Sequence, residues 1–265
     1  MNDKRLSFGE NVENYDQWRP GYSRELYDDI YSYSHITDQF RIIEIGCGTG
    51  QATAKFLSDG YFVQAIEISE TMCAYVAQKF SDYPNFKVSQ GAFEEYALKE
   101  NSADLIYSAT AFHWINQEVG FSKIHQILKP GGSLALFWNH PFVGREDDPL
   151  HQRIQTIYNK YGELGYREKC GKPKEIDASI FNCMCEKIRN HGFREVECKI
   201  YRRVREFTAE EYVKLLNTYS DHRAMEETAR INFEEEIAEA IRESGGKLQV
   251  YDTMDLYLGK NVKKQ

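Results

Sequence analysis

The chain has 265 residues, of which 42% are hydrophobic and 28% charged, so it can bury a sizeable core. A formal net charge of −8 argues against a polyanion-binding surface, and no apolar run approaches the roughly 18 residues that cross a bilayer. No apolar segment follows residues 1–5 and only six cysteines are present, so we expect a cytoplasmic protein with reduced thiols.

Short β-branched runs alternate with amphipathic segments between residues 40 and 138, a pattern typical of βαβ units over a parallel sheet. The predicted strands are 41–45, 62–66, 86–89, 103–108 and 134–138. The predicted helices are 51–58, 70–80 behind a Ser69 N-cap, and 118–128, which a Lys-Pro-Gly-Gly turn at 129–132 ends. The right-handed crossover rule then predicts an open, doubly wound sheet.

Beyond residue 141 the pattern becomes less regular. We predict helices at 150–161, from a Thr208 cap to residue 216, and through Ile231 to a Gly245 stop, with strands at 193–207 and 248–258. Segment 162–177 shows little periodicity. The Cys-x-Cys pair at 183 and 185 would point its thiols about 200° apart on a helix, so we expect no metal site there.

The most informative motif runs from Glu44 to Gly50 and reads Glu-Ile-Gly-Cys-Gly-Thr-Gly, after a predicted strand and at the start of a helix. Glycines at alternate positions let the backbone turn tightly and approach a ligand closely. The nicotinamide fingerprint would need a further glycine at position 51, which is Gln51. Glu67 ends the second strand, where a carboxylate can accept both hydroxyl protons of a ribose.

These features, together with the block from Ala103 to Trp114 and the turn at 129–132, resemble class I S-adenosylmethionine-dependent methyltransferases. The N-terminal Tyr15-x-x-x-Arg19-Pro-x-Tyr22 is further similar to a small-molecule subgroup with trans-aconitate methyltransferases among its relatives. The resemblance covers residues 8–140. It implies a mostly parallel, seven-stranded α/β sheet of the Rossmann-like methyltransferase type, with helical cap elements.

The resemblance also implies which residues hold S-adenosylmethionine. The methionine half would lie against 44–50, the ribose on Glu67, and the adenine near residues 92–94. The residues expected to bind the cofactor are Tyr15, Arg19, Glu44, Gly46, Cys47, Gly48, Gly50, Glu67, Ile68, Ala92, Phe93 and Ala109.

The loop 109–115 ends the fourth strand, at the carboxyl edge where open α/β sheets bind ligands. We expect Tyr22, His113 and Trp114 to bind the acceptor, with His113 and Tyr15 as the candidate catalytic residues. A base is needed only if the acceptor must lose a proton, and His113 has a suitable ordinary pKa of about 6.5. Two roles stay open for His113: a general base, or a residue that positions the loop. A carboxylate acceptor would already be ionised and would need no base.

Tyr15, Trp18, Arg19 and Tyr22 make the segment before the first strand unusually aromatic. We expect residues 8–22 to form a lid that becomes ordered over the cofactor, with Arg19 paired to a carboxylate of cofactor or substrate. The alternative is a helix docked permanently against the domain edge.

The sequence therefore predicts one methyltransferase domain: N-terminal lid and helices at 1–38, a cofactor-binding core at 39–140, a cap insertion at 141–190, and C-terminal strands and helices at 191–265. The expected reaction is methyl transfer from S-adenosylmethionine to a small molecule, at an oxygen or carboxylate nucleophile. Three alternatives stay open: a nucleic-acid methyltransferase, a nicotinamide-dependent oxidoreductase and a non-catalytic cofactor-binding protein. We expect neither a membrane nor a nucleic acid as partner, and the sequence leaves the oligomeric state open.

Overall fold

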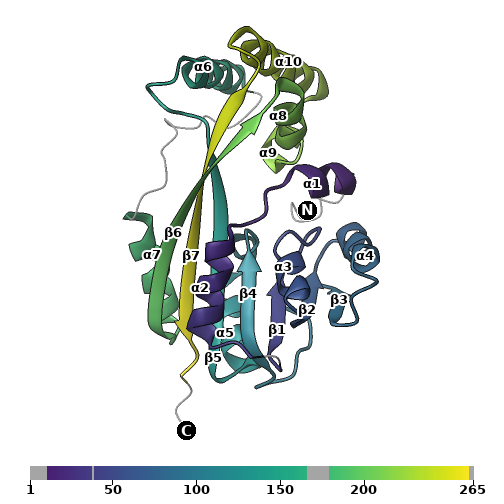
Figure 1. The fold of residues 1–265 in the computed structure, drawn as a ribbon, viewed down its shortest axis with the longest axis vertical. Helices are drawn as coiled ribbons and strands as arrows, with labels where there is room; N and C mark the ends of the chain where they lie inside the picture. The colour runs from purple at the N-terminus through teal and green to yellow at the C-terminus, as the bar shows by residue number, and fades with distance from the viewer. Residues whose placement is uncertain (1–10, 38, 166–178, 263–265) are drawn as a thin grey trace.

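A computed structural model describes residues 11–37, 39–165 and 179–262. Its centre is a seven-stranded sheet of order β3-β2-β1-β4-β5-β7-β6, with helices on both faces (Figure 1). Strands β1 to β5 are mutually parallel, as the βαβ pattern predicts. The elements of this half are β1 (Arg41–Ile45), α3 (Thr53–Ser58), β2 (Phe62–Glu67), α4 (Glu70–Lys79), β3 (Phe86–Gln90), β4 (Ala103–Ala109), α5 (Gln117–Ile127) and β5 (Leu128–Phe142).

Strand β5 is longer than predicted at both ends. Leu128 pairs with Ala103, and the register then shifts so that Ser133 pairs with Leu105. The predicted turn at 129–132 is therefore an irregularity inside β5, where Gly131 has a φ of +79°. Glycine tolerates this left-handed conformation, so the strand can bulge and continue instead of ending.

The two C-terminal strands, β6 (Arg194–Phe207) and β7 (Leu248–Lys260), lie close to their predicted positions. Strand β7 lies between β5 and β6 and is antiparallel to both. The sheet is therefore mixed, and the predicted parallel arrangement holds for β1 to β5 alone. Alternation along a strand reports which face is buried but carries no information about strand direction.

Alternate residues of the central strands face two separate hydrophobic clusters. Ile42 of β1 packs with α2 (Arg24–Ser34), α3 and α4 on one face of the sheet. Ile43 and Ile45 pack on the other face with α5 and α7 (Ser179–Asn190). Residues 42–45 of β1 are buried on both faces of the sheet and are apolar except at Glu44, which lies on the same face as Ile42.

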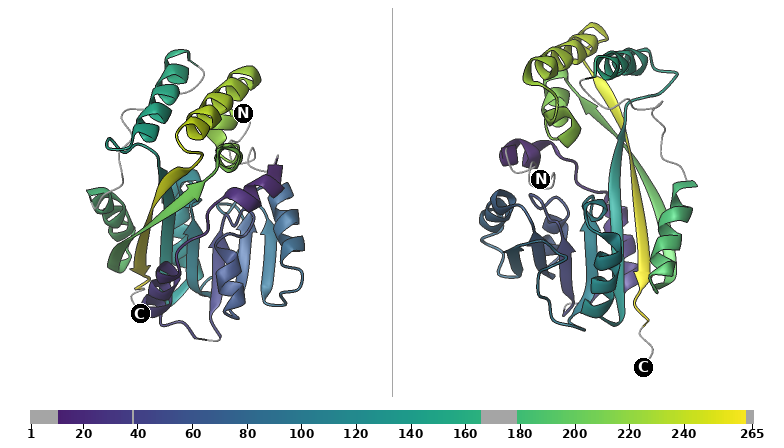
Figure 2. Two further views of the ribbon diagram at one scale, coloured as in Figure 1. Left: turned by 45° about the horizontal axis from the view of Figure 1, so that its top comes forward. Right: turned by 180° about the vertical axis from the view of Figure 1, so that it is seen from behind.

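Strands β5, β6 and β7 extend beyond the rest of the sheet and carry four helices, which we call the cap (Figure 2). The cap contains a third hydrophobic cluster, with Ile154, Leu215 and Phe233 among its buried side chains. The cap helices are α6 (Pro149–Glu163), α8 (Ala209–Leu216), α9 (Ser220–Arg223) and α10 (Glu227–Glu243). The start of α8 has the predicted capping box, in which the side chains of Thr208 and Glu211 each accept a backbone N–H.

The predicted cap segment 141–190 is divided in the structure. Helix α6 belongs to the cap, whereas α7 packs low on the sheet, where Cys185 and Ile188 join the cluster beneath β6 and β7. The cap instead draws most of its helices from the C-terminal part of the chain. No helix in the described part of the chain is long and apolar enough to cross a membrane.

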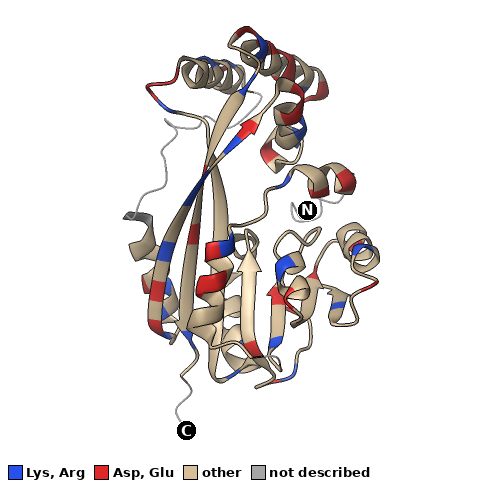
Figure 3. Cartoon of the chain, viewed as in Figure 1, with Lys and Arg blue, Asp and Glu red and all other residues tan. Residues whose placement is uncertain are grey.

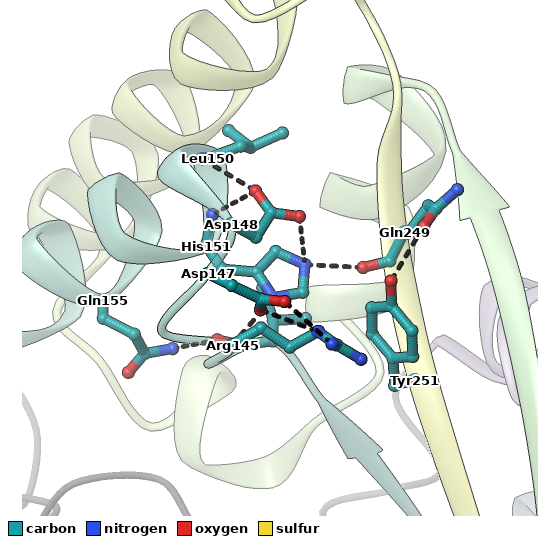
Figure 4. Close-up of polar contacts among 9 residues, drawn as sticks. Arg145, Asp147, Asp148, Leu150, His151, Gln155, Gln249 and Tyr251 are labelled. Atoms are coloured by element: carbon teal, nitrogen blue, oxygen red, sulfur yellow. Dashed lines mark hydrogen bonds and ion pairs between the residues drawn. The ribbon is translucent and has the colours of Figure 1, made fainter.

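A buried histidine fastens the cap to the sheet (Figure 4). Nδ1 of His151 accepts the backbone N–H of Arg145 at 3.1 Å, so in the neutral ring Nε2 carries the proton and donates to the Gln249 carbonyl at 2.8 Å. Asp148 caps α6 by accepting the N–H groups of Leu150 and His151. The junction between β5 and α6 is therefore held directly to β7, and the cap is anchored where it leaves the sheet.

Candidate active site

A pocket of about 270 Å³ lies at the carboxyl ends of the parallel strands, between the sheet and the cap. This is the edge at which open α/β sheets bind ligands. Most of the residues predicted from the sequence come together in its lining. They are Tyr15, Arg19, Tyr22, Glu44, Gly46, Cys47, Gly48, Glu67, Ile68, Phe93, Ala109, His113 and Trp114.

The glycine loop forms the floor of the pocket. Gly46 and Gly48 have φ values of +69° and +55°, and a Cβ atom on Gly46 would lie 2.7 Å from Cβ of Ala111. Gly46 also donates its N–H to the Ile66 carbonyl at 2.8 Å. The loop thus needs glycine both for its backbone conformation and for its close approach to the segment after β4.

Glu67 joins the loop to the next helix. Its Oε2 accepts the N–H of Gly48 at 2.8 Å, and its Oε1 accepts the N–H of Ser69 at 2.9 Å. The side chain is only 4% exposed, and burial raises the pKa of its carboxyl group, although the backbone hydrogen bonds oppose this shift. Each oxygen can accept a second hydrogen bond, so Glu67 can hold the loop and a ligand hydroxyl together.

Glu44 is fully buried beneath the loop. Thr53 donates its hydroxyl to Oε2 at 2.6 Å, while Oε1 has no hydrogen-bond partner among the described residues. Burial raises the pKa of Glu44 to about 7, because removal from water disfavours the carboxylate. Burial likewise raises the pKa of the Cys47 thiol, which disfavours the reactive thiolate form.

Gly50 and Ala92, both predicted to bind the cofactor, lie outside the pocket lining. Gly50 has a φ of +88°, and a Cβ atom there would lie 2.4 Å from Cε2 of Phe80. Position 50 therefore needs a glycine so that the loop can pack against Val76 and Phe80, in and directly after α4. The Ala92 carbonyl accepts the N–H groups of Glu95 and Tyr96, so this residue forms a turn beside the pocket and leaves Phe93 to line it.

Helix α1 (Val12–Trp18) and the residues after it cover the pocket. Arg19 lies between two aromatic rings, with its Cζ 5.0 Å from the centroid of Tyr15 and 4.3 Å from that of Tyr219. Its Nη2 donates to the Thr218 carbonyl at 2.8 Å, whereas its buried Nε has no hydrogen-bond partner among the described residues. A guanidinium with an unpaired, buried N–H is suited to bind a carboxylate.

His113 lies in a short 3-10 helix after β4, formed by Phe112–Trp114. The indole of Trp138 donates its N–H to Nδ1 of His113 at 3.0 Å. Partial burial lowers the pKa of His113, and the nearby His140 lowers it further. On the same side of the pocket, the hydroxyl groups of Tyr22 and Thr110 are hydrogen-bonded at 2.7 Å.

Several lining residues were not predicted from the sequence. Thr110 directly follows β4 and Asn139 lies near the carboxyl end of β5, where the rule that ligands bind at carboxyl ends of strands could have found them. Tyr219, Ser220 and Asp221, at the start of α9, reach the pocket from the cap. No motif marks these three residues, because only the folding of the cap brings them to the sheet edge.

Comparisons with known proteins agree with this geometry. Residues 43–136 match the family model described as a methyltransferase domain. An uncharacterized methyltransferase of Schizosaccharomyces pombe is 24% identical over 216 residues, which are 81% of this chain and 78% of that protein. A probable S-adenosylmethionine-dependent methyltransferase of Saccharomyces cerevisiae is 29% identical over 197 residues, 71% of this chain and 65% of that protein.

Among solved structures, Haemonchus contortus phosphoethanolamine N-methyltransferase 2 in complex with S-adenosylhomocysteine shares the fold, with a TM-score of 0.57 at 14% identity. The match covers 98% of this chain and 60% of that enzyme. The protein is an S-adenosylmethionine-dependent methyltransferase, with a methyltransferase domain at residues 43–136. The matched residues of this methyltransferase contain both the glycine loop and Glu67, and the whole chain forms the seven-stranded α/β sheet that the resemblance implied, with β7 antiparallel to its neighbours.

Proposed function

We propose that the protein transfers the methyl group of S-adenosylmethionine to a small molecule, at an oxygen or carboxylate nucleophile. The main support for this proposal is that the glycine loop with Glu67 and the residues around His113 and Tyr22 line one continuous pocket. Its volume of about 270 Å³ lies just below the usual range of about 300–1,000 Å³ for small-molecule sites, which favours a small acceptor over a polymer.

The chemistry of the lining fits S-adenosylmethionine. The Glu67 carboxylate, held by two backbone N–H groups, would accept the ribose hydroxyls, and the ring of Phe93 would pack against the adenine. The unpaired Nε of Arg19 would bind the cofactor's carboxylate, with Tyr15 over the glycine loop. The cofactor supplies a methyl group bound to a positively charged sulfur, and the cover provided by α1 would limit the access of water that competes with the acceptor.

The acceptor would occupy the end of the pocket lined by Tyr22, His113, Trp114 and the start of α9. Figure 3 shows acidic residues on α1, α8 and α10, the helices on the cap side of the pocket. With a net charge of −8, this distribution disfavours a nucleic acid as acceptor. The motif from Tyr15 to Tyr22 supports a place near the trans-aconitate methyltransferases.

Two measurements test this proposal. Isothermal titration of the purified protein with S-adenosylhomocysteine and, separately, with NAD should give binding of the first alone. Incubation with labelled S-adenosylmethionine should then methylate members of a panel of small carboxylic acids and hydroxy compounds, and leave tRNA and duplex DNA unlabelled. Labelled nucleic acid without a labelled small molecule would overturn the proposed acceptor class, and binding without any turnover would favour a non-catalytic role.

A further inference from the structure

The hydrogen bond between Trp138 and His113 decides which ring nitrogen of the histidine carries a proton. An indole N–H can only donate, so the Nδ1 atom that receives it at 3.0 Å must offer a lone pair. A neutral imidazole has one protonated nitrogen, and here it is Nε2. Nε2 has no hydrogen-bond partner among the described residues, although His113 lines the pocket.

The donor is held rigidly in place. Trp138 is 8% exposed in β5, and its ring meets that of Tyr257 edge-on at 6.0 Å. The Tyr257 hydroxyl is in turn bonded to buried Asp255 at 2.9 Å. The indole therefore cannot turn away from His113 without disrupting the packing of β5 against β7.

Two effects disfavour a second proton on the His113 ring. A proton on Nδ1 would face the indole N–H directly, and the pKa of His113 is already lowered by burial and by His140. His140 is itself paired with Asp255 at 3.0 Å. The other charged groups that line the pocket are the carboxylates of Glu44, Glu67, Glu94 and Asp221, together with Arg19.

A second polar side chain lies unpaired beside this histidine. Asn139 follows Trp138 in β5 and lines the pocket, and its buried amide nitrogen and oxygen both lack a hydrogen-bond partner in the described part of the chain. A buried amide without hydrogen-bond partners lowers the stability of the folded protein, unless a bound ligand forms those hydrogen bonds. The acceptor end of the pocket thus offers two N–H donors, from His113 and Asn139, and His113 itself is not available as a base because its lone pair on Nδ1 is occupied by the indole.

We propose that His113 is a fixed hydrogen-bond donor to the methyl acceptor, that Asn139 provides a second polar contact, and that the acceptor is a small molecule that presents an already ionised carboxylate. This inference rests on the proposed methyl transfer and names its substrate class. An acceptor oxygen forms the new bond to the methyl carbon, while the electron pair of the broken carbon–sulfur bond remains on sulfur. No proton has to leave, so no general base is required.

The first test observes the ring directly and needs no substrate. Nitrogen-15 NMR of histidine-labelled protein, with the His113 signal assigned from its loss in His113→Gln, should show a protonated Nε2 and an unprotonated Nδ1. In Trp138→Phe this preference should weaken, because the indole donor is gone. A proton on Nδ1 in the unmodified protein would overturn the inference while leaving the proposed methyl transfer intact.

The second test compares two substitutions of His113, by Gln and by Asn, whose side-chain amides differ in length. The amide nitrogen of Gln can replace Nε2, whereas the shorter Asn places its amide near Nδ1. With a carboxylate acceptor, His113→Gln should stay within about 10-fold of the unmodified kcat/KM, and His113→Asn should lose about 10- to 100-fold, mainly through KM. A general base would instead make both variants about 10²- to 10⁴-fold slower in kcat.

The pH dependence separates the same two roles. A donor keeps its Nε2 proton in either charge state, so kcat should not fall as the pH drops through the lowered pKa of His113. A base would lose activity in that range, and this loss would overturn the inference. Methylation of amines but not of carboxylates would also overturn it, whereas failure to bind S-adenosylhomocysteine would overturn the proposed function instead.

Discussion

Replacing Glu67 by Gln should weaken the glycine loop and the cofactor site at the same time. The carboxylate accepts the N–H groups of Gly48 and Ser69 at 2.8 and 2.9 Å, and an amide can accept only one of them because its NH2 group faces the other donor. A hydrogen bond to a charged group contributes about 1.5–3 kcal/mol, so we expect a similar loss in the free energy of unfolding. Loss of the contact to the ribose should also weaken S-adenosylhomocysteine binding about 10- to 100-fold.

Glu70 provides a matched control for this substitution. It lies three residues further along, is exposed, and occupies the first turn of α4, so Glu70→Gln removes the same charge from the same region without touching the loop. Its stability should change by less than about 1 kcal/mol, through the helix dipole alone. Urea unfolding and isothermal titration on both variants measure the two effects. Equal binding constants in Glu67→Gln and Glu70→Gln would remove Glu67 from the cofactor site.

Three further predictions follow from buried or covered groups. Burial raises the pKa of Glu44 to about 7, so the native state retains a proton that the unfolded chain releases near its ordinary value of 4.5, and stability falls as the pH rises through that window. Glu44→Gln should abolish about 3 kcal/mol of this fall, measured by urea unfolding of cofactor-free protein at pH 4 and pH 8. Gly50→Ala should lower the free energy of unfolding by about 2–5 kcal/mol, because a Cβ atom at this position would both strain the backbone and clash with Phe80. Gly60→Ala should lower it by only about 1–2 kcal/mol, because Gly60 has the same φ of +88° but no neighbour to clash with. Equal losses in the two variants would refute the clash. Hydrogen exchange in residues 8–22, of which 8–10 lie outside the described residues, should slow when S-adenosylhomocysteine binds if this segment is a lid, and equal exchange in both states would identify a permanently docked helix.

The cofactor end of the pocket could be predicted because its signals are local. A glycine loop between a strand and a helix, followed by an acid at the end of the next strand, specifies its neighbours through the βαβ geometry itself. The same pattern could not separate glycines that approach a ligand from those that fit a neighbouring side chain. Gly46 and Gly48 are in the pocket, whereas Gly50 packs against Phe80, and nothing in the spacing distinguishes them.

The acceptor end depends on contacts between distant parts of the chain. His113 was a predictable site residue, but its proton position depends on Trp138, whose side chain meets it only because β5 pairs with β4. The start of α9 reaches the pocket because β5, β6 and β7 extend together and carry the cap. Helix periodicity predicted α10 and its Gly245 stop, yet it could not say which surface the cap would face.

Helix α1 joins the two parts of the protein that build the pocket. On the sheet side, Asp16 accepts hydrogen bonds from Lys79 at 2.5 Å and Tyr75 at 3.0 Å, both from α4. On the cap side, Asn14 donates to the Lys214 carbonyl at 2.9 Å, and Trp18 packs against the cap cluster. The sheet supplies the glycine loop and Glu67, while the cap supplies the far wall, so α1 sets the distance between the two ends of the pocket. A change of acceptor can therefore arise in the cap and α1 while the cofactor end stays unchanged.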